Sequence, residues 1–452
     1  MDELIRANPW WKEKTEIEND FHIKKVEKST LSWQPVFISV FEQGLYSIRG
    51  PRQVGKTTWM KLTIKDLLRK VNKENIMYFN CDILNNYIDI LNIIRNYFEL
   101  FENKDKRYIF LDEVSYIEDW QKAIKHLYDS GELENCVVVV TGSFSIDIKK
   151  SIEKLPGRIG LGKRHFKILP LSFAEFLEAR GSDLVNKKNK KLYIKELNKE
   201  LHNYLITGGF PMVIDYFNNH GYIDETFYEI YKNWIIGDLE KWSKSEKYSK
   251  QIFKRIIETF SSEVNWEGLS SGTDIDAHST IQSYVSLFED IFAVNYINKM
   301  DYNKNIPDYP KSKKIYFADP FIFYSVWKWC YGEEKNFEYF KDKMRLSDFK
   351  SKIIEMVVLN NIVKRMEHET KLNNFDYKDN VFYWFNKTKS VEVDFVIKKD
   401  LKALEVKWTN RIRDEHFKAQ KYFDDFKVLT KDKVGKNRVP VCIFLIEEER
   451  LL

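Results

Sequence analysis

Short apolar runs alternate with helical patterns in the first third of the chain. Four runs have the length of a strand: GLYSIR (44–49), IMYFN (76–80), RYIFL (107–111) and NCVVVVT (135–141). Between them, apolar residues recur at helical spacing over 55–69, 83–101 and 120–127. Strands that are apolar along their whole length and alternate with helices predict a parallel sheet with helices on both faces. We therefore expect an α/β fold for this part.

The middle of the chain has a different pattern. A charge-rich stretch at 186–200 (NKKNKKLYIKELNKE) is interpreted as the end of the first unit. Helical patterns at 252–260, 266–269 and 279–292 precede two strand-like runs at 293–298 and 314–317. Three helices followed by a two-stranded ribbon predict a winged helix at about residues 250–320.

The last hundred residues predict a third part. A helix at 348–366 precedes short strands at 381–386, 391–398 and 401–408, and a helix at 414–423 and a strand at 439–446 complete the pattern. We therefore predict three domains: an α/β domain at 1–185 with an N-terminal extension at 1–43, a helical region with the winged helix at 186–345, and a smaller α/β domain at 346–452.

Composition limits the classes of protein that fit this pattern. The chain has 452 residues, of which 43% are hydrophobic and 31% charged, which is a globular balance. Its four cysteines form no C-x-x-C pair, and no apolar run approaches the ~20 residues that span a bilayer. The first residues, MDELIRANPWWKEK, lack the apolar core of a signal peptide. We expect a reduced, cytoplasmic protein without a membrane partner.

Charge is unevenly distributed. The formal net charge is +5, and residues 350–452 contain 22 Lys and Arg against 17 Asp and Glu, so the C-terminal part accounts for the whole basic excess. This distribution permits nucleic-acid binding but does not by itself indicate it.

A phosphate-binding loop follows the first strand. The sequence GPRQVGKTT matches G-x-x-x-x-G-K-[ST] in full, with a strand before it and a helix after it. The glycines let backbone N–H groups turn toward phosphates, and the helix adds its positive N-terminal end. Lys56 would reach the β- and γ-phosphates of ATP, and the Thr57 hydroxyl would ligate Mg²⁺. The residues expected to contact ATP are Gly50, Pro51, Arg52, Gln53, Val54, Gly55, Lys56, Thr57 and Thr58.

An acidic pair ends the third strand. Asp112 and Glu113 follow RYIFL, and ligands of open α/β sheets bind at the carboxyl ends of the strands. Asp112 would hold Mg²⁺ through water, and Glu113 would activate the attacking water. One strand–helix unit at 76–101 separates the pair from the loop. This spacing is consistent with a strand between the two catalytic strands, as in AAA+-like rather than GTPase proteins.

Two further roles have open alternatives. Thr141 or Ser143, at the end of the fourth strand, would point at the γ-phosphate as a polar sensor, although such residues also make ordinary turns at strand ends. Arg158 could act as an arginine finger, in a homo-oligomer from one subunit to the next, although a lone arginine is more often a solvated side chain.

Several motifs together carry a family resemblance. They are RGPRQVGKTT (49–58), YIFLDEV (108–114), TGS (141–143), PLSFAEF (170–176), GGFP (208–211) and FADP (317–320). With these motifs, about residues 30–452 resemble the archaeal-type ATPase family, AAA+-like ATPases with a C-terminal domain of the PD-(D/E)XK nuclease type. The first two motifs are specific to ATPases, and the later ones suggest this family. The resemblance implies nucleotide hydrolysis and action on DNA, without a settled substrate.

The C-terminal part contains a candidate metal site. Asp394 lies in VEVDFVI, and Glu405 and Lys407 share one face of the next strand-like segment, LEVK. Together with Glu355 on the preceding helix, they match the PD-(D/E)XK pattern. Asp394, Glu405 and Glu355 would bind Mg²⁺ or Mn²⁺, and Lys407 would position or activate water. Alternating charges also occur on the ordinary solvent face of strands, which is the other interpretation.

These patterns predict a Mg²⁺-dependent ATPase coupled to nucleic-acid binding, with DNA as the expected partner and metal-dependent cleavage by the C-terminal domain. ATP and Mg²⁺ are the expected cofactors, with a second Mg²⁺ or Mn²⁺ in the C-terminal domain. The alternative is a nucleotide-dependent switch that binds a protein partner and carries an inactive nuclease-like domain.

Overall fold

The computed structural model describes residues 1–32, 42–102, 105–142, 162–332, 334–447 and 450–452. The chain divides into two compact units. The first comprises Met1–Leu169 with Lys371–Asn374, and the second comprises Pro170–Thr370 with Phe375–Leu452. The predicted positions Ser143 and Arg158 lie outside the described residues.

The first unit is built on a parallel sheet of five strands. These are β1 (Gly44–Arg49), β2 (Ile76–Asn80), β3 (Arg107–Asp112), β4 (Cys136–Gly142) and β5 (His165–Lys167). Their order is β2-β3-β4-β1-β5, so the predicted parallel sheet is confirmed. A strand does separate the two strands that carry the motifs, but it is β4, and the 76–80 strand forms the edge.

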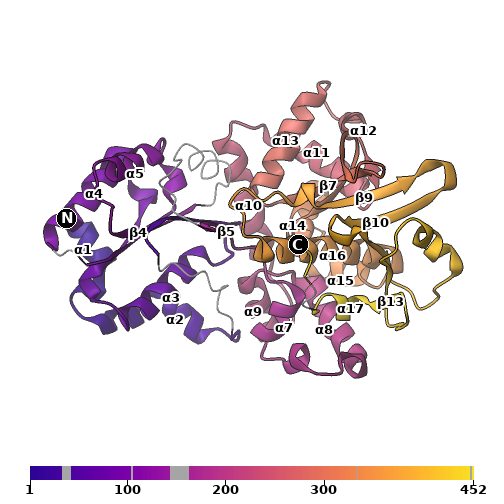
Figure 1. The fold of residues 1–452 in the computed structure, drawn as a ribbon, viewed down its shortest axis with the longest axis horizontal. Coiled ribbons are helices and arrows are strands. Elements are labelled where there is room, and N and C mark those ends of the chain that lie inside the picture. The colour runs from indigo at the N-terminus through magenta and orange to yellow at the C-terminus, as the bar shows by residue number, and fades with distance from the viewer. Residues whose placement is uncertain (33–41, 103–104, 143–161, 333, 448–449) are drawn as a thin grey trace. The chain divides into compact units, whose positions relative to one another are not determined.

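Helices cover both faces of this sheet. Figure 1 shows α4 (Tyr87–Leu100) and α5 (Trp120–Asp129) on one face, and α3 (Lys56–Leu68) on the other. On the α4 and α5 side, alternate strand residues such as Met77, Ile109 and Val138 are fully buried in one hydrophobic core with both helices. This regular packing places the carboxyl ends of β1, β3 and β4 side by side.

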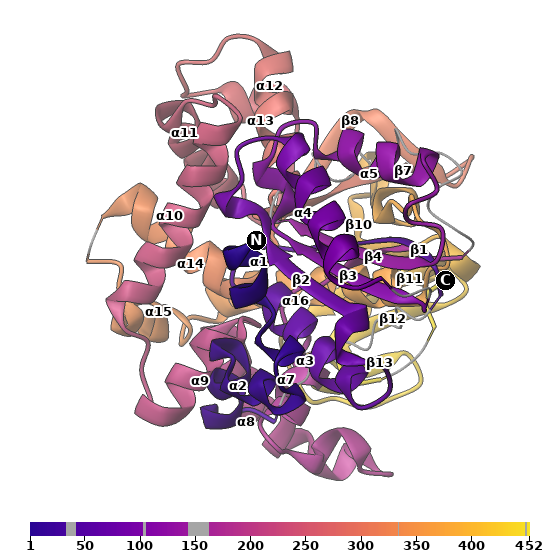
Figure 2. The ribbon, with the colours of Figure 1, turned by 90° about the vertical axis from the view of Figure 1, so that its left-hand side faces the viewer.

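The N-terminal segment, for which the sequence predicted no elements, covers the free edge of the sheet. It forms α1 (Asp2–Ala7), η1 (Pro9–Trp11), η2 (Lys14–Asn19) and α2 (Phe21–Lys28), and Figure 2 shows α1 beside β2. Asn8 Nδ2 donates to Tyr78 O at 2.9 Å, and Asn8 Oδ1 accepts from Tyr78 N at 2.6 Å. The Trp10 and Trp11 indoles both donate to Ile76 O. These bonds satisfy edge-strand groups that would otherwise pair with another chain.

The second unit begins with helices and continues into the predicted three-helix pattern. The first helices are α7 (Phe173–Ala179), α8 (Ile194–Thr207), α9 (Pro211–His220) and α10 (Glu225–Lys241). Next come α11 (Glu246–Glu258), β6 (Glu263–Val264), α12 (Trp266–Ser270), α13 (His278–Asp290), β7 (Val294–Asp301) and β8 (Ile306–Phe317). The order of three helices and a ribbon is thereby confirmed, although β8 begins at Ile306 rather than at residue 314. The sequence also missed the short strand β6, which pairs with β8.

The rest of the second unit extends the same sheet. After α14 (Pro320–Tyr331), α15 (Phe337–Lys343) and α16 (Ser347–Glu369) come β9 (Val381–Asn386), β10 (Val391–Ile397), β11 (Lys402–Lys407), β12 (Phe426–Thr430) and β13 (Arg438–Pro440). Strands β9, β10 and β11 are antiparallel, and β12 runs parallel to β11. Because β7 pairs with β9, the ribbon and the C-terminal strands form one eight-stranded mixed sheet.

One prediction near the C-terminus is wrong. The strand predicted at 439–446 ends at Pro440, and the helix α17 (Val441–Phe444) follows it. Proline has no N–H for a strand ladder but is tolerated just before a helix, which explains the change. The helix predicted at 414–423 is present as the 3₁₀ helix η11 (Asp414–Lys421).

Candidate functional site

The phosphate-binding loop has the backbone geometry that its sequence predicts. It connects β1 to α3, and Gly55 at the helix start has a φ of 101°, in the left-handed region. A Cβ at Gly50 would lie 2.2 Å from Ile168 O, so no larger residue fits there. Helix α3 has no side-chain cap hydrogen bond at its N-terminus, and a helix N-terminus attracts an anion.

Lys56 lies inside this loop. Its side chain is 5% exposed, and its Nζ donates to Gly50 O at 3.1 Å and to Pro51 O at 3.0 Å. Pro51 and Val54 are buried, Arg52, Thr57 and Thr58 are half-buried, and Gln53 is exposed. The loop therefore holds a buried cation beside the N-terminus of α3, a combination that fits the phosphates of a nucleotide.

Asp112 is the centre of a hydrogen-bond network at the end of β3. Thr57 Oγ1 donates to its Oδ2 at 2.7 Å, and Thr141 Oγ1 donates to its Oδ1. Tyr78 donates its phenol hydrogen to Oδ2 at 3.1 Å. Burial, followed by the charge of Asp112, raises the pKa of Tyr78 well above its usual range, so the phenol remains a donor. The threonine and the carboxylate expected to share Mg²⁺ are thus in direct contact.

Glu113 sits next to this network in a strained backbone conformation. Its φ is 52°, which is uncommon for a residue other than glycine, and such conformations cluster at functional sites. Its N–H donates to Thr141 Oγ1 at 3.1 Å. Its carboxylate lies 4.0 Å from Lys56 Nζ. The Glu113 carboxylate thus lies near Lys56 of the loop. The Asp112 carboxylate instead contacts Thr57 and Thr141.

The first unit therefore brings together most of the predicted nucleotide-site residues. Lys56, Thr57, Asp112, Glu113 and Thr141 meet at the carboxyl ends of β1, β3 and β4. The sequence analysis missed Tyr78. It lies on β2, and no local motif marks it, although a tyrosine in an apolar strand two residues before the strand end is a weak signal.

The predicted C-terminal metal ligands lie around a lysine that the sequence analysis also missed. Lys314 on β8 is almost fully buried, and its Nζ lies 3.0 Å from Asp394, 3.3 Å from Glu355 and 2.7 Å from Glu392. Tyr316 donates to Glu355 at 2.6 Å, and Val406 N donates to Asp394 Oδ2 at 2.9 Å. The ammonium group thus supplies a cation to the carboxylates. Lys314 directly follows Lys311, Ser312 and Lys313 in β8, so no local pattern marks it.

Glu405 and Lys407 form the other half of this cluster. Lys407 Nζ lies 2.6 Å from Glu405 Oε1, whereas Glu405 Oε2 is buried without a hydrogen-bond partner. Burial and the nearby charge of Asp394 raise the pKa of Glu405 to about 8 and that of Glu355 to about 7. Burial alone would raise the pKa of Asp394, but Lys314 and Lys407 lower it. Among the described residues, no group of three or more His, Cys, Asp or Glu is arranged to hold a metal ion.

Three of the motifs that carry the family resemblance meet in the second unit. Gly209 N donates to Asp319 Oδ2 at 2.7 Å, which joins GGFP to FADP. Leu171 N donates to Gly209 O at 2.8 Å, which adds PLSFAEF. A Cβ at Gly209 would lie 2.3 Å from Leu171 O. These motifs therefore build a close-packed structural junction within the second unit.

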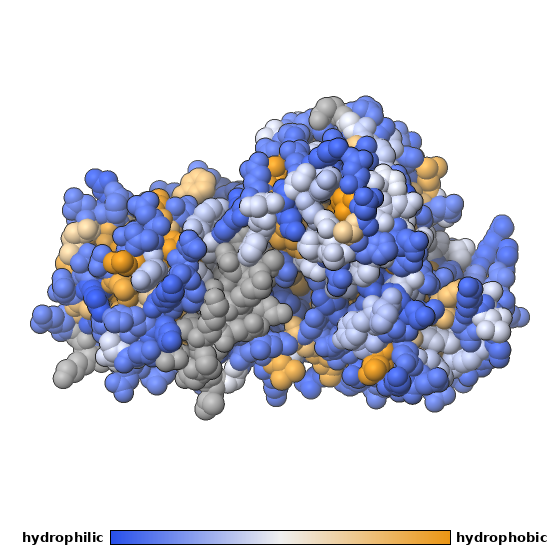
Figure 3. Space-filling model, turned by 90° about the horizontal axis from the view of Figure 1, so that it is seen from above, coloured by the Kyte–Doolittle hydropathy of each residue, from blue (hydrophilic) through white to orange (hydrophobic). Residues whose placement is uncertain are grey.

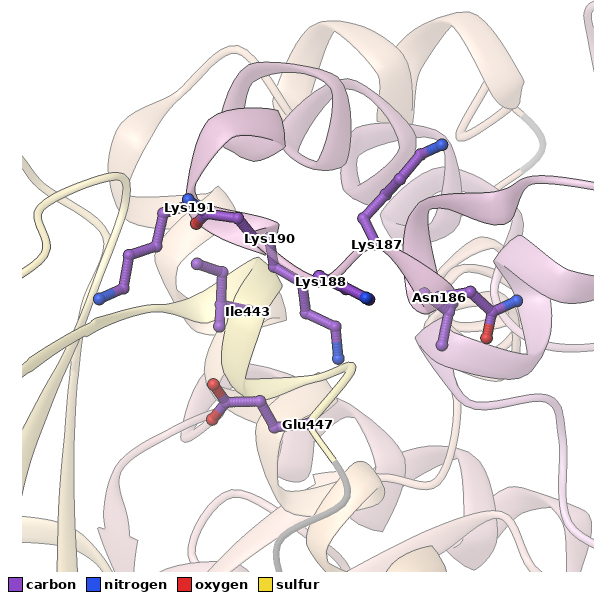
Figure 4. Close-up of a pocket in the computed structure, with 9 residues that line it drawn as sticks. Asn186, Lys187, Lys188, Lys190, Lys191, Ile443 and Glu447 are labelled. Atoms are coloured by element: carbon purple, nitrogen blue, oxygen red, sulfur yellow. The ribbon is translucent and has the colours of Figure 1, made fainter.

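A cavity of about 600 Å³ lies elsewhere in the second unit, between the loop at 185–191 and α17. Four lysines line it, namely Lys187, Lys188, Lys190 and Lys191. Figure 4 shows Lys187 and Lys191 extending in opposite directions, and Lys190 Nζ donates to Ile446 O at 3.1 Å. The carboxylate of Glu447 is also part of the lining. The ammonium groups therefore do not converge on one ligand position.

Three family models match successive parts of the chain. An AAA domain matches residues 42–177. Two domains of unknown function, DUF8612 and DUF4143, match residues 198–330 and 350–441. Among the helices that the structure describes, none is long and apolar enough to cross a membrane.

Two relatives that match this chain are named only as uncharacterized proteins. An uncharacterized protein of Methanocaldococcus jannaschii is 25% identical over 416 residues, which cover 87% of this chain and 82% of the relative. An uncharacterized protein of Haemophilus influenzae is 30% identical over 176 residues, which cover 37% of this chain and 39% of the relative.

Solved structures give only limited overall similarity. The ORC2 protein of Aeropyrum pernix has a TM-score of 0.36 at 13% identity and covers 64% of this chain and 88% of its own. A RuvB protein of Thermotoga maritima has a TM-score of 0.29 at 14% identity and covers 57% of this chain and 82% of its own. At these low scores, the fold assignment rests on the strand order and the matched AAA domain. The chain carries an AAA domain of the P-loop ATPase type, followed by two domains of unknown function.

Proposed function

We propose that this protein is a Mg²⁺-dependent ATPase. The observation that carries the proposal is the contact of Asp112 with both Thr57 and Thr141, beside Lys56 and Glu113. In this proposal Lys56 would be the cation that binds phosphate, Thr57 and Asp112 would supply oxygen atoms to Mg²⁺, and Glu113 would be the base. The matched AAA domain, at residues 42–177, supports the same reading.

Each residue has a distinct role in this proposal. Mg²⁺ would neutralise charge on the phosphates, with Thr57 as a ligand and Asp112 holding it through water. When ATP binds, Lys56 Nζ would leave the carbonyl oxygens of Gly50 and Pro51 and contact the β- and γ-phosphates. The backbone N–H groups of the loop at 50–58 would lie next to the same phosphates. Glu113 would accept a proton from the attacking water. Thr141 or Ser143 would sense the γ-phosphate, and Arg158 of a neighbouring subunit in a homo-oligomer would stabilise the transferring group.

Replacement of Glu113 tests the proposal most directly. Glu113→Gln keeps the size of the side chain but removes the base, so ATP should still bind while turnover falls by about 100-fold or more. Phosphate release and equilibrium binding of a fluorescent ATP analogue are the two measurements. Turnover at the wild-type rate would show that Glu113 is not the base, and failure of the wild-type protein to bind ATP would overturn the function itself.

We propose nucleic-acid binding, with DNA as the partner, as the role of the second unit. Its support is the order of α11, β6, α12, α13 and the β7–β8 ribbon, which is that of a winged helix, together with the basic excess of residues 350–452. DNA binding through lysine and arginine weakens steeply with salt, and this is the measurement that tests it. Binding that is insensitive to salt would favour a nucleotide-dependent switch with a protein partner.

Metal-dependent cleavage by a PD-(D/E)XK-like domain is the second candidate activity. Its support is the order α16, β9, β10, β11, η11, β12 and the buried, unpartnered Glu405 Oε2, an atom that a cation would satisfy. Asp394, Glu405 and Glu355 would be the ligands of Mg²⁺ or Mn²⁺, and Lys407 would position water. A metal ion would have to compete with Lys314 for Asp394 and Glu355. Cleavage assays with Mn²⁺ on single-stranded, duplex and branched DNA test this candidate.

The surface does not favour the protein-partner alternative on the face that Figure 3 displays. Among the described residues on that face, hydrophobic residues occur singly or in small groups between hydrophilic ones. A stable protein interface usually has a continuous apolar centre.

We also retain the division into domains at 1–185, 186–345 and 346–452 as a proposal, because each of the three family matches falls within one of these ranges.

A further inference from the structure

The N-terminal segment at residues 2–28 has no assigned role. It precedes the matched AAA domain, which begins at residue 42, yet it belongs to the same compact unit. Its hydrogen bonds from Asn8, Trp10 and Trp11 all reach β2, the strand that carries Tyr78. The segment is therefore fixed to the strand next to Asp112.

A buried ion pair makes a second connection from this segment. Lys61 on α3 is 5% exposed, and its Nζ lies 3.1 Å from Asp20 Oδ2. Asp20 is itself held in place as the N-cap of α2, where its side chain accepts from His22 N at 2.8 Å. Lys61 also lies one helical turn after Thr57, so both side chains emerge on the same side of α3.

Tyr78 links this ion pair to the predicted Mg²⁺ site. The Lys61 ammonium lies 3.5 Å from the centre of the Tyr78 ring, which is a close cation–π contact in a buried position. The phenol of the same ring donates to Asp112 Oδ2, the oxygen that also accepts from Thr57. A cation over the ring draws electron density from the phenol and strengthens it as a donor.

We propose that the N-terminal segment positions Asp112 for Mg²⁺ through Asp20, Lys61 and Tyr78. The inference rests on the proposed ATPase function. Tyr78 is the positioning residue: its hydrogen bond fixes the rotation of the carboxylate, so that the oxygens of Asp112 already face the metal position. Asp20 holds the Lys61 ammonium over the ring. Loss of the phenol group frees the carboxylate and raises the Mg²⁺ concentration that the site needs.

The test is Tyr78→Phe in the full-length protein. Phenylalanine keeps the ring under Lys61 and removes only the hydroxyl. We expect the Mg²⁺ concentration for half-maximal enhancement of ATP-analogue binding to rise about fivefold, since a hydrogen bond to a charged group contributes at least that much. Binding of the analogue in EDTA and the midpoint of thermal unfolding should stay unchanged. The half-maximal Mg²⁺ concentration for hydrolysis should rise in parallel.

Tyr108→Phe is the matched control. Tyr108 is a 6% exposed tyrosine on β3, opposite Ile76 at the far end of the sheet from the site, and its replacement should leave the Mg²⁺ dependence at the wild-type value. Asp20→Asn should shift the Mg²⁺ dependence in the same direction as Tyr78→Phe, by a smaller factor.

The outcomes separate the inference from the function on which it rests. Equal Mg²⁺ dependence in wild type, Tyr78→Phe and Tyr108→Phe would overturn the inference and leave the ATPase proposal intact. An equal loss of binding with and without Mg²⁺ would show general damage to the fold and would also overturn the inference. If the wild-type protein binds no nucleotide, both the function and the inference fail.

Discussion

The Lys314 ammonium lies 3.0 Å from Asp394 Oδ1, at the centre of three carboxylates from α16 and β10. This lysine occupies the position at which the sequence predicts a metal ion. The Lys314 ammonium and a divalent metal ion can each offset the repulsion between carboxylates that are held close together.

Lys314→Met should destabilise the second unit by about 3–5 kcal/mol, because it leaves buried carboxylates without their cation. If these carboxylates can hold a metal, millimolar Mn²⁺ should restore part of the stability of the variant while changing the wild type much less. Urea unfolding with and without Mn²⁺ measures both effects. Lys313→Met is the control, since the buried Lys313 ammonium donates to the backbone carbonyls of Tyr309 and Lys311 rather than to a carboxylate. A variant that is indifferent to Mn²⁺ would argue against a metal site.

Lys56→Ala should weaken ATP binding by about 100-fold, which corresponds to about 2.7 kcal/mol. The alanine removes the one buried cation of the loop while Gly50, Gly55 and the helix N-terminus remain. Equilibrium binding of a fluorescent ATP analogue checks the prediction, and intact thermal unfolding would show that the loop is still folded. Undiminished affinity in the variant would remove the loop from the proposed site.

Gly209→Ala should strongly destabilise the second unit. The new Cβ would meet Leu171 O at 2.3 Å and Leu171 N at 2.7 Å, and both are backbone atoms that a rotamer change cannot move. Gly237→Ala is the matched control, because no atom lies within 4 Å of its Cβ position in α10 and alanine favours a helix by up to ~1 kcal/mol. Thermal unfolding of both variants should therefore shift in opposite directions. A Gly209 variant of wild-type stability would mean that the motif junction can open at little cost.

The stability of the second unit should depend on pH through Asp319. Burial raises the pKa of this carboxyl from 3.8 to about 7, so the folded protein binds a proton that the unfolded chain releases. The stabilisation of the folded state by this bound proton is therefore fully present below about pH 4 and is lost as the pH rises through about 7. The Asp319→Asn variant has no carboxyl group to titrate at this position. The free energy of unfolding of the wild type, relative to that of the variant, should therefore fall by about 2 kcal/mol from pH 5.5 to pH 8. Urea unfolding at both pH values measures it, and a constant difference would contradict the raised pKa.

The parts of the molecule that the sequence predicts correctly are those that local patterns determine. Apolar strands and contiguous motifs are sufficient to predict the parallel sheet, the loop around Lys56 and the acidic pair at Asp112, because each depends on neighbours within a few residues. The roles of Ser143 and Arg158 stay predictions, since both lie outside the described residues.

What the sequence does not predict depends on contacts between distant segments. Tyr78 lies 34 residues before Asp112, and Lys314 lies 80 residues before Asp394, so no spacing rule connects them. The N-terminal segment lacks a clear period because it packs through single side chains such as Asn8 onto a strand edge. The mistaken strand at 439–446 has the same origin, since an apolar run of that length fits a strand or a short buried helix equally.

The pairing of β7 with β9 has a consequence for dissecting the protein. Met300 of β7 is part of the hydrophobic core of the C-terminal strands, and Tyr302 donates to Tyr422 O at 2.8 Å. A fragment that begins after β8 would lose these contacts and expose the edge of β9. The N–H and C=O groups of that edge would then form hydrogen bonds with other copies of the fragment. The winged-helix region and the strands that carry Asp394 and Glu405 therefore share one sheet, so a ligand that binds the ribbon would also act on those strands.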